Sequence, residues 1–424
     1  MLEPENVLLT QSQQRGRSIP PPLMMSKEGS FAHFTLTQRM PDIIRRVISE
    51  NELSSEIVDN LETLIQELSD KIVRAVKDEG KDVADWDRYL QPFIGKHWID
   101  LPWFFAEAYF YRRILEATHY FLPGSSYGVD PYALQKYRGL ETSIHSIREL
   151  IARINAWNNT QQQKKNTSLI ALIHFALWGN RADLSLWPVN AGDNSNSREI
   201  HLEQSHILVD DAARIAEIIA NLKKVRIDFI IDNAGFELVG DLCLADFLLA
   251  SQAAGIIYLH LKPHPTFVSD ATIQDVHNTL KVLASDDSDQ VQSLSRRLQN
   301  YMEQGRLLCR DDYFWTSPLV FWEMPEALRN ELAPSNLIFL KGDANYRRCL
   351  GDRQWSLTTA FKDIVNYFPA PLAALRTLKS EITVGLQLEQ IETLNQEDPQ
   401  WLTNGQWGVI QFVETTDFKK LHNP

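Results

Sequence analysis

The stretch 225–237 (Val-Arg-Ile-Asp-Phe-Ile-Ile-Asp-Asn-Ala-Gly-Phe-Glu) holds the residue types best suited to chemistry in this chain. An apolar, β-branched run stops at two adjacent oxygen-bearing side chains, Asp232 and Asn233, and a glycine then lets the chain turn. In an open α/β sheet, ligands bind at the carboxyl ends of the strands. A carboxylate and a carboxamide placed there offer hard oxygen ligands, which suit Mg²⁺ or Mn²⁺ better than zinc. The stretch therefore predicts a metal-dependent site.

A second carboxylate ends another apolar segment. The segment begins at Ile256 and runs to Asp270, which follows Asp232 by 270 − 232 = 38 residues. This separation is about one strand–helix repeat, since a βαβ unit takes roughly 30 residues or more. The two carboxylates are therefore expected on neighbouring strand ends, where they would share one ion.

Cationic side chains follow two later apolar segments. Asp343, Asn345 and Arg347 come after the run that begins at residue 337, and a short basic cluster brings Arg376 and Lys379. Arginine offers phosphate a planar fork and lysine offers it a point charge. A hard divalent ion beside several such cations is the usual equipment for hydrolysing a phosphate monoester.

Each pattern also has a simpler structural interpretation. Asn233 could cap the helix that follows it, and Asp270 could be an N-cap. The segment 343–347 alone could be a solvated loop, and 376–379 a charged helix face.

Other catalytic motifs fail for specific reasons. His260 and His264 have the spacing of zinc ligands on a helix, but prolines flank His264, so packing or loop contacts are expected for both. Ala234 stands two residues after Asp232, so the paired-aspartate nucleophile of haloacid-dehalogenase-type phosphatases is missing. The sequence contains no phosphate-binding glycine loop after a strand and no G-x-S-x-G elbow.

The elements that must position these residues fall into two parts. Apolar residues recur at helix spacing over 41–76, 102–114 and 143–157, so the first 160 residues or so are predicted to be mainly α. The polar stretch 158–167 is predicted to be a surface linker, and 191–197 a second loop.

Beyond the linker, strands and helices alternate. Strands are predicted at 206–209, 225–231, 255–261, 336–340 and 405–413, with helices at 210–223, 237–250 and 271–284. This alternation indicates an α/β fold with a mainly parallel, doubly wound sheet and helices on both faces. We therefore divide the chain into a helical N-terminal region with an extended arm (1–160) and a metal-binding catalytic domain (161–424).

The composition and charge of the chain exclude some classes of function. The chain has 424 residues, of which 44% are hydrophobic and 23% charged, as in ordinary globular proteins. A net charge of −13 argues against nonspecific nucleic-acid binding, although a local cation still permits an anionic small substrate. The three cysteines are too scattered for a disulfide framework, and Cys243 is expected in the core. Without a signal-peptide pattern or an apolar run long enough to span a bilayer, we expect a cytoplasmic monomer with no membrane partner.

Several segments in series resemble the damage-control phosphatase family (formerly domain of unknown function 89), in subfamily III, which includes the acidic-residue methyltransferase-like proteins. The matching pieces are 232–237 (Asp-Asn-Ala-Gly-Phe-Glu), 267–270 (Phe-Val-Ser-Asp), 342–347 (Gly-Asp-Ala-Asn-Tyr-Arg) and the subfamily signature 376–379 (Arg-Thr-Leu-Lys). Further likeness at 31–35, 103–113 and 177–186 extends the resemblance from about residue 31 to beyond 380, in the same order.

The resemblance implies a helical N-terminal region joined to a three-layer α/β/α domain. It implies that Asp232, Asn233 and Asp270 bind a divalent metal ion, either Mn²⁺, Mg²⁺, Co²⁺ or Ni²⁺. The segment 343–347 and Lys379 would hold the phosphorylated substrate. Members of the subfamily act on sugar phosphates such as fructose 1-phosphate and fructose 6-phosphate.

We accordingly hypothesise a metal-dependent phosphatase for small phosphorylated metabolites. The ion, held by its carboxylate ligands, would bind a phosphoryl oxygen and orient the attacking water. Arg347, Arg376 and Lys379 are the cations expected at the phosphate, which Asn345 would help to position. Asp343 would act as general base or bind sugar hydroxyls.

Other candidates and functions stay open. Glu107 lies among aromatics on a predicted helix, where its charge needs a partner that Arg112 or Arg113 could supply. Asn180 follows an apolar run and suits capping as well as substrate contact. Glu237 matches a position that the family's methyltransferase interpretation assigns to S-adenosylmethionine. A carboxyl methyltransferase using that cofactor and a noncatalytic sugar-phosphate sensor are therefore the alternatives.

Overall fold

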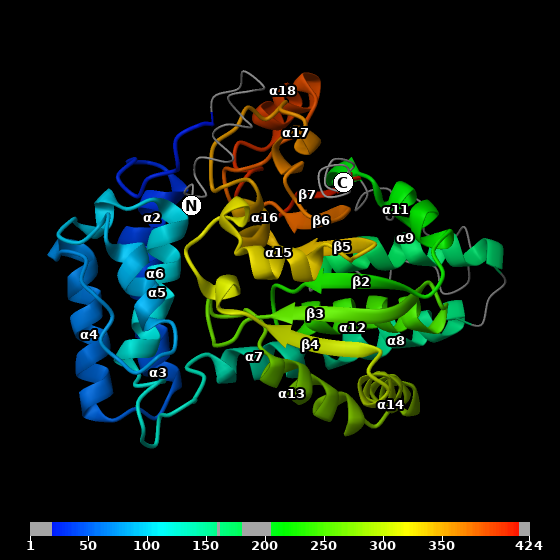
Figure 1. Cartoon of the computed structure of the whole chain (residues 1–424), viewed down its shortest axis with the longest axis horizontal. Coiled ribbons are helices and arrows are strands. Elements are labelled where there is room, and N and C mark those ends of the chain that lie inside the picture. The colour runs from blue at the N-terminus through cyan, green and yellow to red at the C-terminus, as the bar shows by residue number, and fades with distance from the viewer. Residues whose placement is uncertain (1–18, 159–161, 180–204, 415–424) are drawn as a thin grey trace.

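The computed structural model describes residues 19–158, 162–179 and 205–414 (Figure 1). The predicted loop 191–197 and Asn180 lie outside these residues. Seven strands of the described chain form a sheet with the spatial order β1-β7-β6-β5-β2-β3-β4. In chain order they are β1 (Ile207–Asp210), β2 (Val225–Ile230), β3 (Ala254–Leu261), β4 (Leu307–Asp311), β5 (Leu337–Lys341), β6 (Leu372–Thr377) and β7 (Gly408–Val413).

The sheet is mainly parallel, as predicted. Only β6 and β7 pair antiparallel, and the five other neighbouring pairs are parallel. The predicted strands appear as β1, β2, β3, β5 and β7, whereas β4 and β6 were not predicted. From β2 the chain passes to β3 on one side and later returns through β5 on the other. The topological switch point therefore lies at the carboxyl ends of β2 and β5, where ligands bind in such sheets.

Side chains of the central strands alternate between two hydrophobic cores. Ile338 and Leu340 belong to one core, whereas Leu337 and Phe339 belong to the other. Successive residues of a strand point to opposite faces. Because both faces are covered, β5 is buried throughout and its sequence shows a continuous apolar run instead of alternation.

Helices cover both faces and complete the three layers. One face carries helices that pack against each other and share a core with the sheet: α8 (Ile144–Asn158), α9 (Gln162–Trp178), α11 (Ala212–Ala220), α12 (Phe236–Ala250), α13 (Ile273–Ala284) and α14 (Asp289–Glu303). The other face shares its core with α15 (Glu326–Leu332), α16 (Asp343–Cys349), α17 (Phe361–Val365) and α18 (Leu388–Glu397). The fold is therefore the predicted α/β/α arrangement.

The N-terminal part is helical, and most of it joins the second of these cores, whereas Leu140 of its last helix belongs to the first. Its helices are α2 (Phe31–Phe34), α3 (Met40–Glu50), α4 (Ser55–Asp70), α5 (Val83–Leu90), α6 (Trp103–Ala117) and α7 (Ala133–Thr142). Short helical turns occupy Thr35–Arg39, Trp98–Asp100, Tyr313–Thr316 and Phe321–Glu323. In Figure 1 the helices α2–α6 stand beside the sheet, at the side toward which β3 and β4 point. The division of the chain near residue 160 stays a prediction.

Two predictions about the helical part need correction. The predicted helix 41–76 is two helices, α3 and α4, and Ile72 beyond them forms a β-bridge with His97. The predicted linker 158–167 is wrong over most of its length, because α9 begins at Gln162. Its polar residues form the first turns of a helix whose later part is buried, so polarity alone did not indicate a loop.

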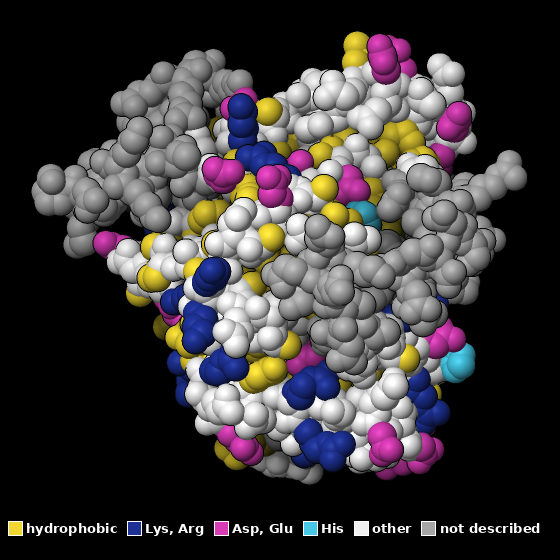
Figure 2. Space-filling view, turned by 90° about the vertical axis from the view of Figure 1, so that its right-hand side faces the viewer, with side chains coloured by type: hydrophobic (Ala, Val, Ile, Leu, Met, Phe, Trp, Pro, Cys, Tyr) yellow, Lys and Arg dark blue, Asp and Glu magenta, His cyan; other side chains and the backbone are white. Residues whose placement is uncertain are grey.

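The described surface has two features that bear on partners. No helix in the described ranges is long and apolar enough to cross a membrane. Figure 2 shows the face at the right-hand side of Figure 1, where Lys and Arg side chains are interspersed with Asp and Glu. The predicted cytoplasmic location and monomeric state stay predictions.

Candidate metal-binding and active site

Backbone pairing beyond the strands brings the predicted metal ligands together. Asn233, just after β2, and Asp270, at the end of the loop that follows β3, form an antiparallel bridge. The Ala271 amide donates to the Asp232 carbonyl and the Ala234 amide donates to the Ser269 carbonyl, each at 2.7 Å. The three predicted ligands therefore lie on two adjacent backbone segments at the switch point of the sheet.

The two carboxylates are buried, and each has an oxygen to which no described residue donates a hydrogen bond. Asp232 is 6% exposed and Asp270 is 2% exposed, and the unbonded atoms are Asp232 Oδ1 and Asp270 Oδ2. Lys262 forms an ion pair with Asp270 Oδ2 at 3.3 Å. Burial raises the pKa of both carboxyl groups, and the charges of Asp270 and Glu237 raise the pKa of Asp232 further. Two buried carboxylates in this state are suited to a cation.

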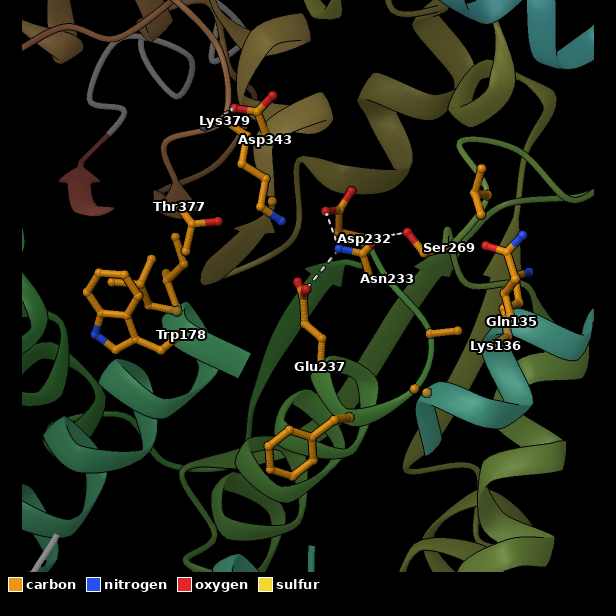
Figure 3. A pocket seen from close by; sticks show the side chains of 18 of the residues that line it. Gln135, Lys136, Trp178, Asp232, Asn233, Glu237, Ser269, Asp343, Thr377 and Lys379 are labelled. Carbon is orange, nitrogen blue, oxygen red and sulfur yellow. Dashed lines mark hydrogen bonds between the residues drawn. The ribbon is translucent and has the colours of Figure 1, made fainter. Parts of the chain in front are cut away.

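Asn233 completes an all-oxygen donor set. Helix α12 begins after Gly235 without a side-chain cap, so the capping interpretation of Asn233 is wrong. Its Nδ2 donates instead to Asp232 Oδ2 at 3.0 Å and to Glu237 Oε2 at 2.8 Å (Figure 3). Its Oδ1 accepts a hydrogen bond from Ser269 Oγ at 2.6 Å. A carboxamide oxygen with a second lone pair available, next to two carboxylates, fits a hard divalent ion.

Asp270 is not a helix cap either, because Thr272 caps α13 in a capping box with Asp275. In the described ranges no three His, Cys, Asp or Glu side chains gather in a metal-binding arrangement. The candidate set differs from such a cluster because one of its three donors is an amide.

Two non-glycine residues just before Asp270, Phe267 and Val268, have positive φ angles of 47° and 67°. Backbone strain of this kind concentrates at functional sites.

Gly342 packs directly against the Asp232 carboxylate. This residue links β5 to α16 and has φ 84° and ψ 172°, a conformation that suits glycine. A Cβ at this position would lie 1.8 Å from Asp232 Oδ2. The absence of a side chain at Gly342 therefore provides the space in which the Asp232 carboxylate sits.

A cavity of about 360 Å³ opens at Asp232 and Asn233, whereas Asp270 is not among the residues that line it. Asp232, Asn233 and Glu237 line it, and Lys379 and Asp343 lie on the side of the loops that follow β5 and β6 (Figure 3). The remaining wall includes α7 at Gln135 and Lys136, the end of α9 at Trp178, and Thr377. Its volume is within the range of small-molecule sites, about 300–1,000 Å³.

Asp343 is held in its ionised form. Its Oδ1 accepts hydrogen bonds from Arg376 Nε at 2.8 Å and Ser380 Oγ at 3.1 Å, with the Lys379 amide at 3.4 Å. Burial opposes the charge, but Arg376 and the other nearby cations outweigh it and lower the pKa of Asp343. Arg376 is 1% exposed and does not line the cavity. It therefore positions Asp343 and is not placed to touch phosphate itself.

Asn345 and Arg347 also lie behind the cavity wall. Asn345 is 1% exposed and donates to two backbone oxygens near the ends of β2 and β5. Arg347 Nη1 donates to Glu107 at 2.6 Å, Arg347 Nε donates to Asp352 at 2.8 Å, and the guanidinium stacks 3.6 Å from the centre of the Trp103 ring. The structure thus does not bring the predicted substrate contacts of Asn345, Arg347 and Glu107 to the cavity, and these roles stay predictions.

The partner expected for Glu107 was wrong. Neither Arg112 nor Arg113 pairs with it, because both bind other acids. Its partner is Arg347, which lies 240 positions away in the sequence. Burial raises the pKa of Glu107 although Arg347 acts against this rise.

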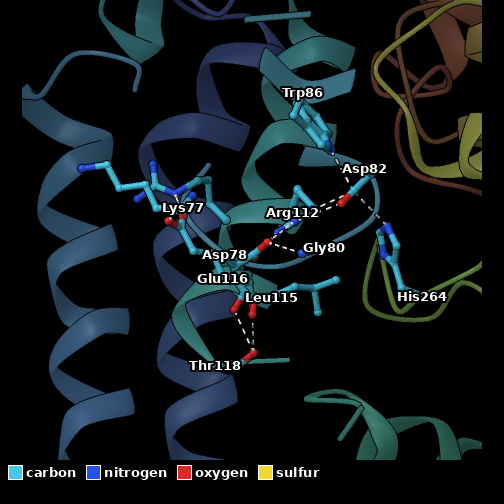
Figure 4. Close-up of polar contacts among 12 residues, drawn as sticks. Lys77, Asp78, Gly80, Asp82, Trp86, Arg112, Leu115, Glu116, Thr118 and His264 are labelled. Carbon is cyan, nitrogen blue, oxygen red and sulfur yellow. Dashed lines mark hydrogen bonds and ion pairs between the residues drawn. The ribbon is translucent and has the colours of Figure 1, made fainter. Parts of the chain in front are cut away.

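The loop that carries Asp270 is tied to the N-terminal helical part (Figure 4). His264, on this loop, lies 3.7 Å from Asp82 Oδ2, and Asp82 also accepts hydrogen bonds from Arg112. Burial opposes the charge of Asp82, but the nearby His264 and the two hydrogen bonds from Arg112 outweigh it and lower the pKa. His264 is thus a loop contact, as predicted, and His260 bonds to the buried Asp228. The N-terminal helices therefore help to position the loop that bears a metal ligand.

Two lysines were missed by the sequence reasoning. Lys262 pairs with Asp270 and stands at the end of β3, so the position after a buried strand was an available signal. Lys136 lines the cavity from α7, and its ammonium lies 2.9 Å from both Asp130 and Asp275. Nothing in the sequence indicated that α7 would reach the site.

Comparison with known proteins identifies relatives of the whole chain. Residues 35–394 match the family described as Damage-control phosphatase ARMT1-like domain. Proteins named Damage-control phosphatase ARMT1 are similar over most of their length. The protein of Danio rerio is 34% identical over 93% of this chain and 97% of its own. That of Mus musculus is 32% identical over 92% and 98%, and that of Homo sapiens 32% over 93% and 98%. A solved duf89 family protein from Pyrococcus horikoshii aligns at 14% identity with a TM-score of 0.43, over 83% of this chain and 96% of that one, too distant a likeness to argue from.

Proposed function

This chain belongs to the damage-control phosphatase ARMT1-like family and is a phosphatase, and from this premise we propose that it hydrolyses sugar phosphates and similar small phosphate monoesters with a divalent metal ion. One observation carries the proposal. Asp232, whose Oδ1 makes no hydrogen bond within the described residues, lines a cavity that Lys379 also lines, and the buried Asp270, paired with Lys262, lies on the backbone segment bridged to Asn233. This arrangement places a metal-binding site next to a lysine ammonium that can bind phosphate.

The residues present fit a hard divalent ion of the kind the family implies. Asp232, Asp270 and the Asn233 carboxamide oxygen would hold it, and all three donors are oxygens. When bound, such an ion polarises a phosphoryl oxygen and lowers the pKa of a bound water. Mn²⁺ and Mg²⁺ are our first choices, with Co²⁺ and Ni²⁺ as further candidates.

The protein's own side chains would orient the substrate. In the described chain no carboxylate forms an ion pair with the Lys379 ammonium, which extends toward Asp232 and is free to bind a phosphate oxygen (Figure 3). Asp343 has its Oδ1 engaged by Arg376 and Ser380, whereas no hydrogen bond within the described residues goes to Oδ2. Because a general base works best with a pKa near the working pH, the lowered pKa of Asp343 favours hydroxyl binding over proton abstraction. We assign Asp343 to the sugar hydroxyls.

Phosphate release tests the proposal directly. A panel of sugar phosphates, fructose 1-phosphate and fructose 6-phosphate among them, is assayed with Mn²⁺, Mg²⁺, Co²⁺ and Ni²⁺ in turn. Asp232→Asn and Asp270→Asn are expected to lower turnover by at least about 100-fold, since each removes a charged ligand worth several kcal/mol. The control is Asp287→Asn, whose side chain is 99% exposed.

The alternatives predict different results in this assay and in titrations with the ligands. Turnover near the wild-type level in either ligand variant would refute the assignment of the site. Tight binding of a sugar phosphate without phosphate release under any of the four ions would select the sensor. Micromolar binding of S-adenosylmethionine without metal would favour the methyltransferase.

A further inference from the structure

A buried lysine stands behind the candidate metal site. Lys341 ends β5, is 1% exposed, and donates from Nζ to the Ala176 carbonyl at 2.6 Å. The same ammonium lies 3.0 Å from Asp241 Oδ1 and 3.4 Å from Glu237 Oε1. Burial alone would lower the pKa of Lys341, but these two carboxylates outweigh it and raise the pKa. The lysine therefore stays charged and holds Glu237 from behind.

Glu237 passes this constraint to a predicted metal ligand. Its Oε1 faces Lys341, while its Oε2 accepts the hydrogen bond from Asn233 Nδ2 at 2.8 Å. The same amide group donates its other N–H to Asp232 Oδ2 at 3.0 Å. Both donors of the Asn233 amide are thus directed at carboxylates, as Figure 3 shows. Only the oxygen end of the amide is left for the cation.

The orientation of this amide matters because its two ends are nearly equal in size and opposite in chemistry. The oxygen can coordinate a hard cation, whereas the NH₂ group has no lone pair to offer. Ser269 cannot decide between the two orientations, since a hydroxyl both donates and accepts. Asp232 and Glu237 can both decide, because an ionised carboxylate only accepts, and Glu237 is the one of the two that is not itself a predicted metal ligand.

We propose that Glu237, held by Lys341, is a positioning residue that fixes the Asn233 amide with its oxygen toward the metal site. This inference rests on the proposed function, because it assumes that Asn233 is a ligand. It assigns Glu237 a role in metal binding that needs no contact with substrate or with S-adenosylmethionine.

The first test is the Glu237→Gln variant, with Mn²⁺ binding measured by titration calorimetry. A glutamine keeps the shape but can donate to the Asn233 oxygen, which stabilises the flipped amide. We expect the dissociation constant for Mn²⁺ to rise about 10–100-fold, as is usual when an outer-shell partner of a metal ligand is changed. The turnover number at saturating Mn²⁺ should fall by much less.

A double-mutant cycle with Asn233→Asp separates orientation from general damage. Aspartate has two equivalent oxygens, so its orientation does not need to be fixed. Glu237→Gln should therefore cost no Mn²⁺ affinity in the Asn233→Asp background, and removal of the repulsion between two carboxylates should even improve it. An equal loss in both backgrounds would overturn the proposal, because it would show that Glu237 acts only through its charge or through folding.

Lys341 needs a paired change. Lys341→Met alone leaves Asp241 buried without a partner and threatens folding, so Lys341→Met is combined with Asp241→Leu. This double variant frees Glu237 and should weaken Mn²⁺ binding about tenfold. The matched control, Asp241→Asn, leaves the bond between Glu237 and Asn233 intact and should keep the Mn²⁺ affinity within about twofold. Unchanged affinity in the double variant would remove Lys341 from the proposal.

The proposed function and the positioning role of Glu237 fail in different ways. Wild-type protein that neither binds Mn²⁺ nor releases phosphate would sink the proposed function. Wild-type protein that does both, with Glu237→Gln unchanged in Mn²⁺ affinity, would sink only the positioning role.

Discussion

Substitution of Gly342 by alanine tests the site through a single methyl group. The new Cβ would lie 1.8 Å from Asp232 Oδ2, whereas an unstrained carbon–oxygen contact is roughly 3.4 Å. The backbone at φ 84° and ψ 172° is also unfavourable for any residue with a Cβ. The Asp232 carboxylate must therefore move away, or the turn between β5 and α16 must open.

Two separate magnitudes follow from this geometry. The backbone strain should lower the free energy of unfolding by about 1–3 kcal/mol. To restore an ordinary contact, the carboxylate or the turn must shift by about 1.5 Å, and a misplacement of about 1 Å can cost 100-fold in rate. We therefore expect Gly342→Ala to lose Mn²⁺ affinity and phosphate release by about 100-fold or more while the protein stays folded.

Gly305→Ala is the matched control. Gly305 also has a positive φ, 67°, but a Cβ there would meet nothing within 4 Å. This variant should lose about 1 kcal/mol of unfolding free energy from strain alone and keep full metal binding. Urea unfolding, Mn²⁺ calorimetry and phosphate release on both variants separate strain from displacement. Wild-type Mn²⁺ affinity in a folded Gly342→Ala protein would refute the view that Asp232 must stay where it is.

Three further outcomes can be checked. Lys379→Met should raise KM by about 10–100-fold with Mn²⁺ affinity unchanged, because one charge-assisted phosphate contact is worth about 1.5–3 kcal/mol, and steady-state kinetics beside calorimetry measures both. Asp82→Asn should lower the unfolding free energy at pH 7 by about 3 kcal/mol. Because the fold lowers the pKa of Asp82, its carboxylate stabilises the fold fully above the unfolded pKa of about 3.9 and loses this stabilisation progressively as the pH falls toward the lower pKa of the folded state. Urea unfolding at pH 7 and pH 3 should therefore show that the difference in unfolding free energy between wild type and variant shrinks. Adding Mn²⁺ at about 100 times its dissociation constant to chelator-treated protein should raise the unfolding free energy by about 2.7 kcal/mol, and should not do so for Asp232→Asn.

The centre of the site was predictable because its signal is local. Asp232 and Asn233 closely follow β2, Asp270 ends the loop that follows β3, and parallel neighbours place their carboxyl ends at one edge of the sheet. A sequence therefore predicts both their proximity and their chemistry. It does not predict the orientation of the Asn233 amide, which depends on Glu237 and Lys341 from two other elements.

The roles of the cations could not be read in this way. A sequence gives the charge of Arg347 and Arg376 but not the carboxylates that neutralise them, which are Glu107 and Asp352 for Arg347 and Asp343 for Arg376. Strand β6 was missed for a related reason. It is buried on both faces, so it lacks alternation, and its arginine suggested a surface cluster.

The pairing of charges around the cavity explains why a divalent ion suits this site. Lys262 pairs with Asp270, Lys341 with Glu237 and Asp241, and Arg376 with Asp343. Burial raises the pKa of Asp241 to about 7, so this carboxyl can carry a proton near neutral pH.

Among the described residues that line the cavity, this pairing leaves Asp232 without an ion pair and Lys379 without a carboxylate. A bound divalent ion would offset Asp232 and keep one positive charge, to which Lys379 adds a second. These two positive charges balance the two negative charges of a phosphate monoester dianion. A monovalent cation would leave the site one charge short, so exchange of Mn²⁺ for K⁺ should abolish binding of the substrate and not merely slow its hydrolysis.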